Sequence, residues 1–330
     1  MAKILVTGGA GFIGLHLAQT LIARGARVDL LDNFGRGVRD ASLEQVLAHP
    51  GVRMLELDLL DADVGARLDR DYDTIVHFAA IIGVAHVLQR PYEVLEHNCR
   101  MLAHAVNCAR GQKNLARFVF ASTSEVYAGT LSSFGMAIPT PEDTPLTVSD
   151  LAQPRTSYML SKIYGEAMCR QSQLPFTIVR PHNVYGPRMG MSHVVPELLK
   201  RAHEARDGDA LQVFSPGHRR TFCYIDDAVD LLVRIIDTPA CRGTVLNLGS
   251  TDAEISIAEL AQTVLAVVGR KLVVEPMPET PGSPARRAPD MSQAQRLTHY
   301  QSKVALGEGV ARTYSWYRRN VFEGTGVNAR

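Results

Sequence analysis

Tyr158 and Lys162 are the two residues whose types and spacing most directly imply chemistry. They stand four positions apart in Tyr158-Met159-Leu160-Ser161-Lys162, which puts a phenol and an ammonium group on one face of a helix. A tyrosine with an ordinary pKa of about 10 is a poor base at neutral pH, but a neighbouring positive charge lowers that pKa. The pair could therefore take a proton from a substrate hydroxyl while a hydride leaves the same carbon. The same spacing is common on solvated helix faces, so its meaning depends on the rest of the chain.

A glycine-rich segment near the N-terminus supplies that context. Gly8, Gly9, Gly11 and Gly14 follow the apolar run Ile4–Thr7 and lead into an apolar helical stretch. The spacing Gly9-x-Gly11-x-x-Gly14 is typical of a dinucleotide loop, in which the turn is tight and the backbone approaches a pyrophosphate. The following helix presents free N–H groups and a positive dipole end to the phosphates. We predict a dinucleotide site here; the alternative is a plain structural turn.

Acidic residues after the next two strands bear on the dinucleotide. Asp32 ends the second predicted strand, 18 residues after Gly14. A carboxylate there can bind an adenosine ribose and would repel a 2′-phosphate, which favours NAD over NADP. Arg36 and Arg39 close by weaken that preference. Asp58 ends the third strand, where it could either meet the adenine or cap a turn.

The elements that must position these groups alternate between strand and helix. Apolar β-type runs are nearly continuous in Val, Ile, Leu and Phe, as expected for strands covered on both faces. This alternation predicts an α/β fold, with a Rossmann-type doubly wound parallel sheet and a smaller C-terminal α/β substrate domain. The predicted strands are 4–7, 28–31, 52–57, 74–78, 118–121, 176–179 and 245–248, and the predicted helices are 12–24, 91–110, 157–172, 193–206, 257–268 and 304–320.

Composition excludes several other classes of protein. The 330 residues carry 35 Lys+Arg against 34 Asp+Glu, and this net charge of +1 argues against a nucleic-acid partner. The five cysteines form no Cys-x-x-Cys pair, and their odd number argues against a disulfide framework. No apolar stretch is long enough for a signal peptide or a membrane span. We expect a cytoplasmic protein that has no membrane partner and binds no metal.

With these motifs in view, the chain resembles the extended short-chain dehydrogenase/reductase family, specifically its NAD-dependent nucleotide-sugar epimerases, dehydratases and decarboxylases. The resemblance spans nearly the whole chain. It rests on Thr7–Gly14, Asp32-Asn33, His77–Ala80, Ser122–Tyr127, Tyr158…Lys162, Arg180–Arg188 and Arg220–Phe222. It implies an NAD-binding Rossmann domain over residues 1–180, to which 216–250 return, and a nucleotide-sugar-binding domain formed by 181–215 and 251–330. It also implies a homodimer, built through the helices at 91–110 and 157–172.

The resemblance further implies roles for individual residues. The catalytic set would be Thr123 at the reacting sugar oxygen, Tyr158 as acid/base, Lys162 holding the tyrosine and the nicotinamide ribose, and Glu125. NAD would also contact Gly8, Gly11, Phe12, Ile13, Gly14, Asp32, Asn33, Asp58, Leu59, Ala79, Ala80, Asn98 and Pro181. The nucleotide-diphosphate sugar would contact Ser124, Asn183, Arg188, Arg220 and Arg287, because guanidinium groups bind a diphosphate with two hydrogen bonds each.

The segment Thr123-Ser124-Glu125 bears on the type of reaction. Oxidation at sugar C4 allows C4 epimerisation, loss of water from C5–C6, or loss of carbon dioxide from a C5 carboxylate. Glu125 resembles dehydratases and uronate decarboxylases, while Ser124 stands where glucose-type 4,6-dehydratases carry Asp. We expect an epimerase or dehydratase, with UDP-glucuronate decarboxylation as the alternative; Glu125 could also only order the sugar. A non-catalytic NAD-binding module is the third hypothesis, which the pair Tyr158 and Lys162 disfavours.

Some positions depart from the family pattern. His182 replaces an aromatic residue before Asn183, and the stretch around His193 and the segment 129–154 are unusual. All of these border the expected sugar pocket. His182 or His193 could be a catalytic base, although a hydrogen-bonded pocket wall is the favoured interpretation.

Overall fold

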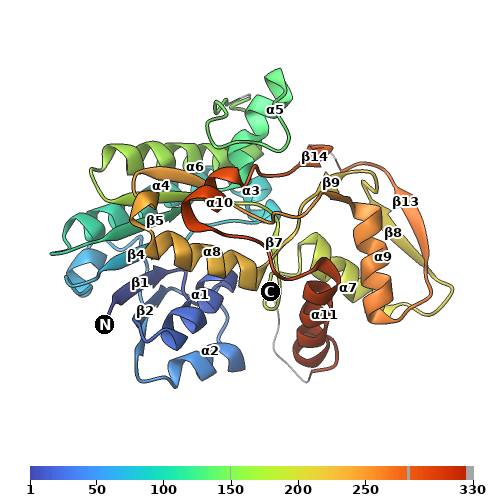
Figure 1. The fold of residues 1–330 in the computed structure, drawn as a ribbon, viewed down its shortest axis with the longest axis horizontal. Helices are drawn as coiled ribbons and strands as arrows, with labels where there is room; N and C mark the ends of the chain where they lie inside the picture. Colours follow the sequence, from blue (N-terminus) through green and yellow to red (C-terminus); the bar gives the residue numbers. More distant parts are fainter. Residues whose placement is uncertain (149, 281–282, 325–330) are drawn as a thin grey trace.

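Seven parallel strands form the central sheet of the computed structural model, which describes residues 1–148, 150–280 and 283–324 (Figure 1). Strand order reverses at β1, so ligands are expected at the carboxyl edge on either side of this strand. The predicted doubly wound parallel sheet is therefore confirmed. Across the sheet the strands are β11 (Thr244–Leu248), β6 (Phe176–Pro181), β5 (Arg117–Ala121), β4 (Thr74–His77), β1 (Lys3–Thr7), β2 (Arg27–Asp32) and β3 (Val52–Glu56).

Alternate side chains of each strand enter two separate cores. Ile4 and Val6 of β1 point into one core, whereas Leu5 between them belongs to the other. Both faces of the sheet are thus covered by apolar side chains, which explains the nearly continuous hydrophobic runs in the sequence.

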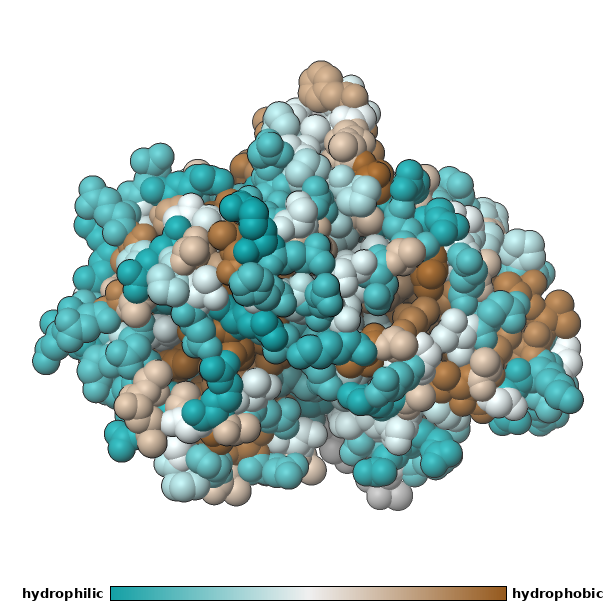
Figure 2. Space-filling view, viewed as in Figure 1, coloured by the Kyte–Doolittle hydropathy of each residue, from teal (hydrophilic) through white to brown (hydrophobic). Residues whose placement is uncertain are grey.

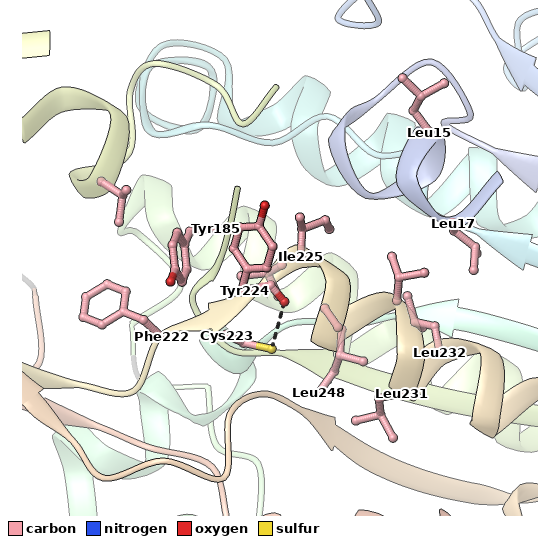
Figure 3. Close-up of a cluster of buried hydrophobic side chains, with 14 of the residues drawn as sticks. Leu15, Leu17, Tyr185, Phe222, Cys223, Tyr224, Ile225, Leu231, Leu232 and Leu248 are labelled. Carbon is pink, nitrogen blue, oxygen red and sulfur yellow. Dashed lines mark hydrogen bonds between the residues drawn. The ribbon is translucent and has the colours of Figure 1, made fainter. Parts of the chain in front are cut away.

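Helices from different parts of the chain cover the two faces. α1 (Phe12–Ala23) and α8 (Ile225–Asp237) pack on one face, and Figure 3 shows Leu15 of α1 and Ile225 of α8 in the same buried cluster. α4 (Pro91–Arg110) and α6 (Pro154–Gln171) lie side by side on the other face (Figure 1). The second of these helices positions the predicted Tyr–Lys pair against β5.

The second half of the chain adds smaller sheets beyond the carboxyl edge. β9 (Arg219–Arg220) lies between β12 (Ile255–Ser256) and β14 (Arg286–Arg287). Because β14 pairs with β9 in parallel, Arg287 stands opposite Arg220. The remaining two-stranded sheets and helices are β7 (Val184–Tyr185) with β10 (Cys223–Tyr224), β8 (Ala210–Phe214) with β13 (Val273–Met277), α7 (Val194–Glu204), α9 (Ile257–Val268), α10 (Ser292–Thr298) and α11 (Leu306–Tyr317).

Several features differ from the sequence-based expectation, including the short helices α2 (Ala41–Leu47) and α3 (Val84–Gln89), which were not predicted. α8, with a strongly amphipathic pattern, was not predicted. α6 begins at Pro154, three residues before the predicted start, because proline is well suited to the first turn of a helix. The unusual segment 129–154 contributes most of α5 (Ala128–Phe134), which projects from the body and ends in apolar atoms (Figures 1 and 2); Phe134 is 77% exposed. Over the described ranges, no helix has the length and apolarity that a membrane span requires.

Candidate active site

A deep cleft of about 820 Å³ opens along the carboxyl edge of the sheet, between the sheet and the smaller second part. It brings together most of the predicted site. Its walls include the predicted cofactor residues Gly8, Gly11, Phe12, Ile13, Gly14, Asp32, Asn33, Asp58, Leu59, Ala79, Ala80, Tyr158, Lys162 and Pro181, and the predicted substrate or catalytic residues Thr123, Ser124, Glu125, Asn183, Arg188 and Arg287. Asn98 and Arg220 are not part of its walls.

The glycine loop forms a tight cradle at one end of the cleft. Gly8 has a φ of +70°, and a Cβ there would lie 2.9 Å from the backbone nitrogen of Ala79. A Cβ on Gly14 would lie only 2.3 Å from the Gly8 carbonyl oxygen. Gly11 precedes α1 without any side-chain cap, so the first N–H groups of the helix stay available. These residues fit the pyrophosphate of a dinucleotide.

Asp32 lies beside this cradle and is 8% exposed. Its two carboxylate oxygens accept hydrogen bonds from the backbone N–H groups of Ala10 (3.0 Å) and Phe34 (2.9 Å). Burial is the main influence on its pKa, which is raised. Asn33 donates to the Asp58 carboxylate at 2.9 Å, and Asp58 also accepts a backbone N–H two residues further on. Asp58 therefore caps a turn at the rim of the cleft.

Arg36 lines the cleft and reaches across it, whereas the sequence analysis considered this residue only for the choice between NAD and NADP. Its Nη1 donates to the carbonyl oxygen of Ile82 at 2.9 Å, which links the loop after β2 to the loop after β4. β1, which leads into the glycine loop, lies between those two strands in the sheet. The sequence feature that could have pointed to this role is the pair Gly35 and Gly37 on either side of Arg36, because glycines allow the loop backbone more conformations.

Thr123, Tyr158 and Lys162 meet where β5 and α6 approach each other. The Thr123 hydroxyl lies close to the Tyr158 phenol and favours its charged form. The Lys162 ammonium donates to the carbonyl oxygen of Ala121 at 2.8 Å and lies 5.8 Å from the centre of the Tyr158 ring. This is the geometry of a proton acceptor held next to a fixed cation.

The pKa values in this group differ from the sequence-based expectation. Burial raises the pKa of Tyr158 to about 12, and the opposing effects of the nearby Thr123 hydroxyl and the Arg36 charge do not outweigh it. Burial likewise lowers the pKa of Lys162 to about 8. The expected lowering of the tyrosine pKa by Lys162 is thus not seen in the protein alone, because the same burial disfavours both charges.

Glu125 and Arg287 form an ion pair on the opposite wall of the catalytic centre. Arg287 Nη1 donates to Glu125 Oε1 at 2.7 Å, across 162 positions of sequence. The Arg287 guanidinium is the largest influence on the pKa of Glu125 and holds it below its usual range. Burial opposes this effect, and the charges of Arg155 and Arg220 reinforce it. Glu125 is therefore ionised at neutral pH and can only accept a proton.

Two of the predicted substrate arginines have other partners. Arg220 is 8% exposed, and its guanidinium donates to the carbonyl oxygens of Arg219, Pro284 and Ala285. Burial lowers its pKa to about 10, with Arg287 contributing. Arg220 thus shapes the wall behind Arg287 instead of facing the cleft.

Arg188 is likewise held by protein groups. Its Nε donates to the Asp40 carboxylate at 2.6 Å and its Nη2 to the carbonyl oxygen of Val38 at 2.9 Å. Its Nη1 also reaches the Ala10 carbonyl oxygen, at 3.2 Å. Arg188 therefore ties the glycine loop to the loop after β2, at the cofactor end of the cleft and not at its sugar end.

The side chains of Asn98 and Asn183 also form hydrogen bonds with backbone groups. Asn98 forms two hydrogen bonds with the backbone of Ile81, so it orders the cleft wall after β4 without lining it. Asn183 lines the cleft and donates to the carbonyl oxygen of Thr221 at 3.0 Å.

The two histidines considered from sequence differ in position. His193 lines the cleft, and burial lowers its pKa. His182 is 1% exposed and is not part of the cleft wall. It therefore cannot touch a ligand in the cleft as the side chains now stand.

Comparison with known proteins identifies the family. A model of the NAD dependent epimerase/dehydratase family matches residues 4–249. The chain belongs to this family. It is 32% identical to a UDP-N-acetyl-alpha-D-glucosaminuronate decarboxylase of Bacillus cytotoxicus, over 96% of this chain and 98% of that protein.

Solved structures with the same fold come from several branches of the family. A UDP-glucuronic acid 4-epimerase of Bacillus cereus, solved with UDP-glucuronic acid and NAD, has a TM-score of 0.82 at 27% identity, covering 96% of this chain and 99% of that one. The dTDP-glucose 4,6-dehydratase DesIV of Streptomyces venezuelae, solved with NAD, has a TM-score of 0.83 at 27% identity, covering 98% and 99%. The protein is accordingly an NAD-dependent enzyme of the nucleotide-sugar epimerase, dehydratase and decarboxylase type.

Proposed function

We propose that this enzyme decarboxylates a UDP-linked hexuronic acid, such as UDP-glucuronate or UDP-N-acetylglucosaminuronate. The observation that carries the proposal is the Glu125–Arg287 ion pair, which lies near Tyr158 and the neighbouring Thr123 hydroxyl. It puts a guanidinium that can bind a sugar carboxylate next to the group that can take a proton from a sugar hydroxyl. The relatedness to a decarboxylase over nearly the full length of both chains supports the same assignment.

The cofactor would occupy the glycine cradle. Gly8, Gly11 and Gly14 would hold its pyrophosphate and Asp32 its adenosine ribose, because these groups supply close backbone N–H donors and a ribose acceptor. When bound, NAD⁺ supplies the hydride acceptor for the C4–H bond. Lys162 would orient the nicotinamide end and Tyr158 would take the proton of the C4 hydroxyl, while Thr123 fixes the phenol.

Oxidation at C4 turns the substrate into a β-keto acid. The bond between C5 and the carboxyl carbon then breaks, carbon dioxide leaves, and the electron pair moves through C5 onto the C4 oxygen as an enolate. One proton taken up at C5 restores the ketone. Glu125 carries a negative charge here, so it repels the substrate carboxylate but not neutral carbon dioxide. The carboxylate of Glu125 therefore favours the bond-breaking step, while Arg287 binds the sugar carboxylate and holds the substrate in position.

The test is Glu125→Gln, with turnover of both UDP-uronates followed by mass spectrometry and NMR. We expect the variant to bind NAD normally and to lose carbon dioxide release at least tenfold. Glu204→Gln, at an exposed glutamate of α7, is the control for the same substitution away from the cleft and should leave the rate unchanged. Normal decarboxylation by the Glu125→Gln variant would overturn the proposed role of the glutamate.

A second candidate, C4 epimerisation of a UDP-uronate, is favoured by the similarity to the Bacillus cereus 4-epimerase. The same substrate panel separates the candidates. Product of unchanged mass with an inverted C4 would overturn decarboxylation, and loss of water from dTDP-glucose or another sugar would point to a dehydratase. Ser124 in place of an acid argues against the glucose-type dehydratase reaction.

We further propose the domain division expected from sequence, with 1–180 and 216–250 binding NAD and 181–215 with 251–330 binding the nucleotide sugar. We also propose a homodimer formed through α4 and α6. Tyr92 on α4 is 76% exposed and Tyr164 on α6 is 49% exposed, which is unusual for side chains of this size. Light scattering behind size-exclusion chromatography tests the dimer, and Tyr164→Glu should convert it to a monomer. A cytoplasmic location stays a prediction.

A further inference from the structure

A second, much smaller cavity lies directly behind the sugar end of the cleft. Its volume is about 10 Å³, close to the room that one water molecule needs. Ser124 and Arg287 line both this cavity and the main cleft, so they form the partition between the two. His182 lines the small cavity from the other side.

The hydrogen-bond polarity of His182 can be worked out from its neighbours. The side-chain nitrogen of Asn247 donates to the carbonyl oxygens of Thr140 (2.9 Å) and Asp290 (3.0 Å), which fixes the orientation of that amide. Its oxygen consequently faces His182 Nε2 at 3.1 Å. An amide oxygen only accepts, so Nε2 carries the proton. Burial lowers the pKa of His182 to about 3, so the ring is neutral and Nδ1 is left as an acceptor.

Nδ1 is an acceptor without a donor. It is buried and has no hydrogen-bond partner among the described residues. An unsatisfied buried nitrogen of this kind is rare, and an ordered water is a usual partner for it. The other polar side chains that line the cavity are Ser124, Tyr127, Thr140, Arg286 and Arg287. The Tyr127 and Thr140 hydroxyls already donate to Asn247 and to the Ala137 carbonyl oxygen, and Arg286 is bound to Glu254.

We propose that one water molecule fills this cavity and that His182, through this water, holds Ser124 as a hydrogen-bond donor to the sugar. The water donates one hydrogen to His182 Nδ1. It accepts a hydrogen bond from Arg287, since a guanidinium can only donate. Its second hydrogen then goes to the Ser124 oxygen, which leaves the Ser124 hydroxyl proton to point into the main cleft.

The consequence concerns the kind of group that the site recognises. Ser124 would donate to a substrate oxygen that carries or gains negative charge, such as a carboxylate or the enolate oxygen at C4. Ser124 thus places a hydrogen-bond donor at the position where glucose-type dehydratases carry an acid. Unlike that acid, the serine hydroxyl cannot transfer its proton to a leaving group at neutral pH. The inference deepens the function proposed above and rests on a nucleotide sugar occupying this end of the cleft; His182 is a positioning residue in it and Ser124 makes the contact.

The first experiment needs no substrate. The NAD-bound enzyme labelled with ¹⁵N-histidine is examined by NMR at pH 7, and His182→Phe identifies the resonances by their loss. This variant keeps an aromatic ring of similar size. We expect His182 to carry its proton on Nε2 and to show a hydrogen-bonded Nδ1, and we expect Ser124→Ala to shift the Nδ1 resonance. A proton on Nδ1, or a resonance that Ser124→Ala leaves unmoved, would overturn the inference.

The second experiment is a double-mutant cycle in kcat/KM with UDP-glucuronate and UDP-N-acetylglucosaminuronate as probes. We expect Ser124→Ala and His182→Phe each to lower kcat/KM about five- to tenfold, through kcat, and the double variant to be no worse than Ser124→Ala alone. Effects that simply multiply would overturn the inference. His203→Phe, on α7 outside the cleft, is the control for replacing a half-buried histidine. Absence of turnover by the unaltered enzyme would count against the proposed function, while the NMR result would still decide the role of His182.

Discussion

Lys162 provides a prediction that can be worked in detail from its burial. Its ammonium is 4% exposed and has a single hydrogen-bond partner among the described residues, the carbonyl oxygen of Ala121. A pKa lowered from 10.5 to about 8 means that the folded protein disfavours the charged form by about 3 kcal/mol. Replacing Lys162 by Met removes that cost and also the hydrogen bond, which contributes about 1 kcal/mol. We therefore expect Lys162→Met, stripped of NAD, to be about 2 kcal/mol more stable than the unaltered chain at pH 7.

The sign of the pH dependence follows from linkage. Below pH 8 both the folded and the unfolded chain hold the Lys162 proton, so the full cost of the buried charge is present. Between pH 8 and 10.5 the unfolded chain binds more protons than the folded chain, so the stability of the unaltered protein rises with pH. The stability advantage of Lys162→Met should shrink accordingly and approach zero near pH 10.

The assay is urea unfolding of both proteins at several values between pH 7 and pH 10. Lys200→Met, at an exposed lysine of α7, is the control for the same substitution at the surface. A difference between Lys162→Met and the unaltered chain that stays constant over this range would refute the reasoning, because it would mean that the buried amine does not titrate as its burial requires. Lys162→Met should nevertheless be inactive, since it removes the cation that faces Tyr158.

Three further predictions concern the cofactor and the proton acceptor. Tyr158→Phe should lower kcat at least a hundredfold with NAD still bound, as measured by product formation and by the NAD content of the purified protein. Gly14→Ala should lose NAD, because its Cβ would stand 2.3 Å from the Gly8 carbonyl oxygen and the loop must shift by about 1 Å. The control is Gly307→Ala, where nothing lies within 4 Å of the added Cβ, and this variant should retain NAD. Arg36→Ala should release NADH about tenfold faster in a fluorescence chase, because the hydrogen bond to the Ile82 carbonyl oxygen across the cleft is lost. An unchanged release rate would show that this hydrogen bond does not retain the cofactor.

Local sequence patterns were sufficient for the sheet and for the cofactor end of the cleft. Each strand of the large sheet is an apolar run. The glycine segment Gly8–Gly14 follows the first strand directly, so the dinucleotide loop could be predicted from one short stretch of sequence. Tyr158 and Lys162 could be paired for the same reason, since the helix that carries both was predictable. The domain limits and the individual site roles stay predictions.

What could not be predicted depends on contacts between distant segments. Arg287 reaches Glu125 only because β14 pairs with β9 in the second half of the chain, and neither two-residue strand has a recognisable pattern. The partners of Arg188 and Arg220 are largely backbone carbonyl groups, which every residue has and no sequence motif marks. The pKa of Tyr158 is likewise governed by burial, a property of the assembled fold and not of a four-residue spacing.

The overall charge of +1 conceals a local excess that bears on the substrate. Arg155, Arg220 and Arg287 all act on the pKa of Glu125, so three positive charges surround one carboxylate at the sugar end of the cleft. A diphosphate brings about two negative charges and would balance that excess without disturbing the Glu125–Arg287 pair. A uronate adds one further negative charge, which can be accommodated only if its carboxylate shares Arg287 with Glu125. A neutral hexose imposes no such competition, so discrimination between uronates and neutral sugars should disappear in Arg287→Gln while the preference for a nucleotide diphosphate persists.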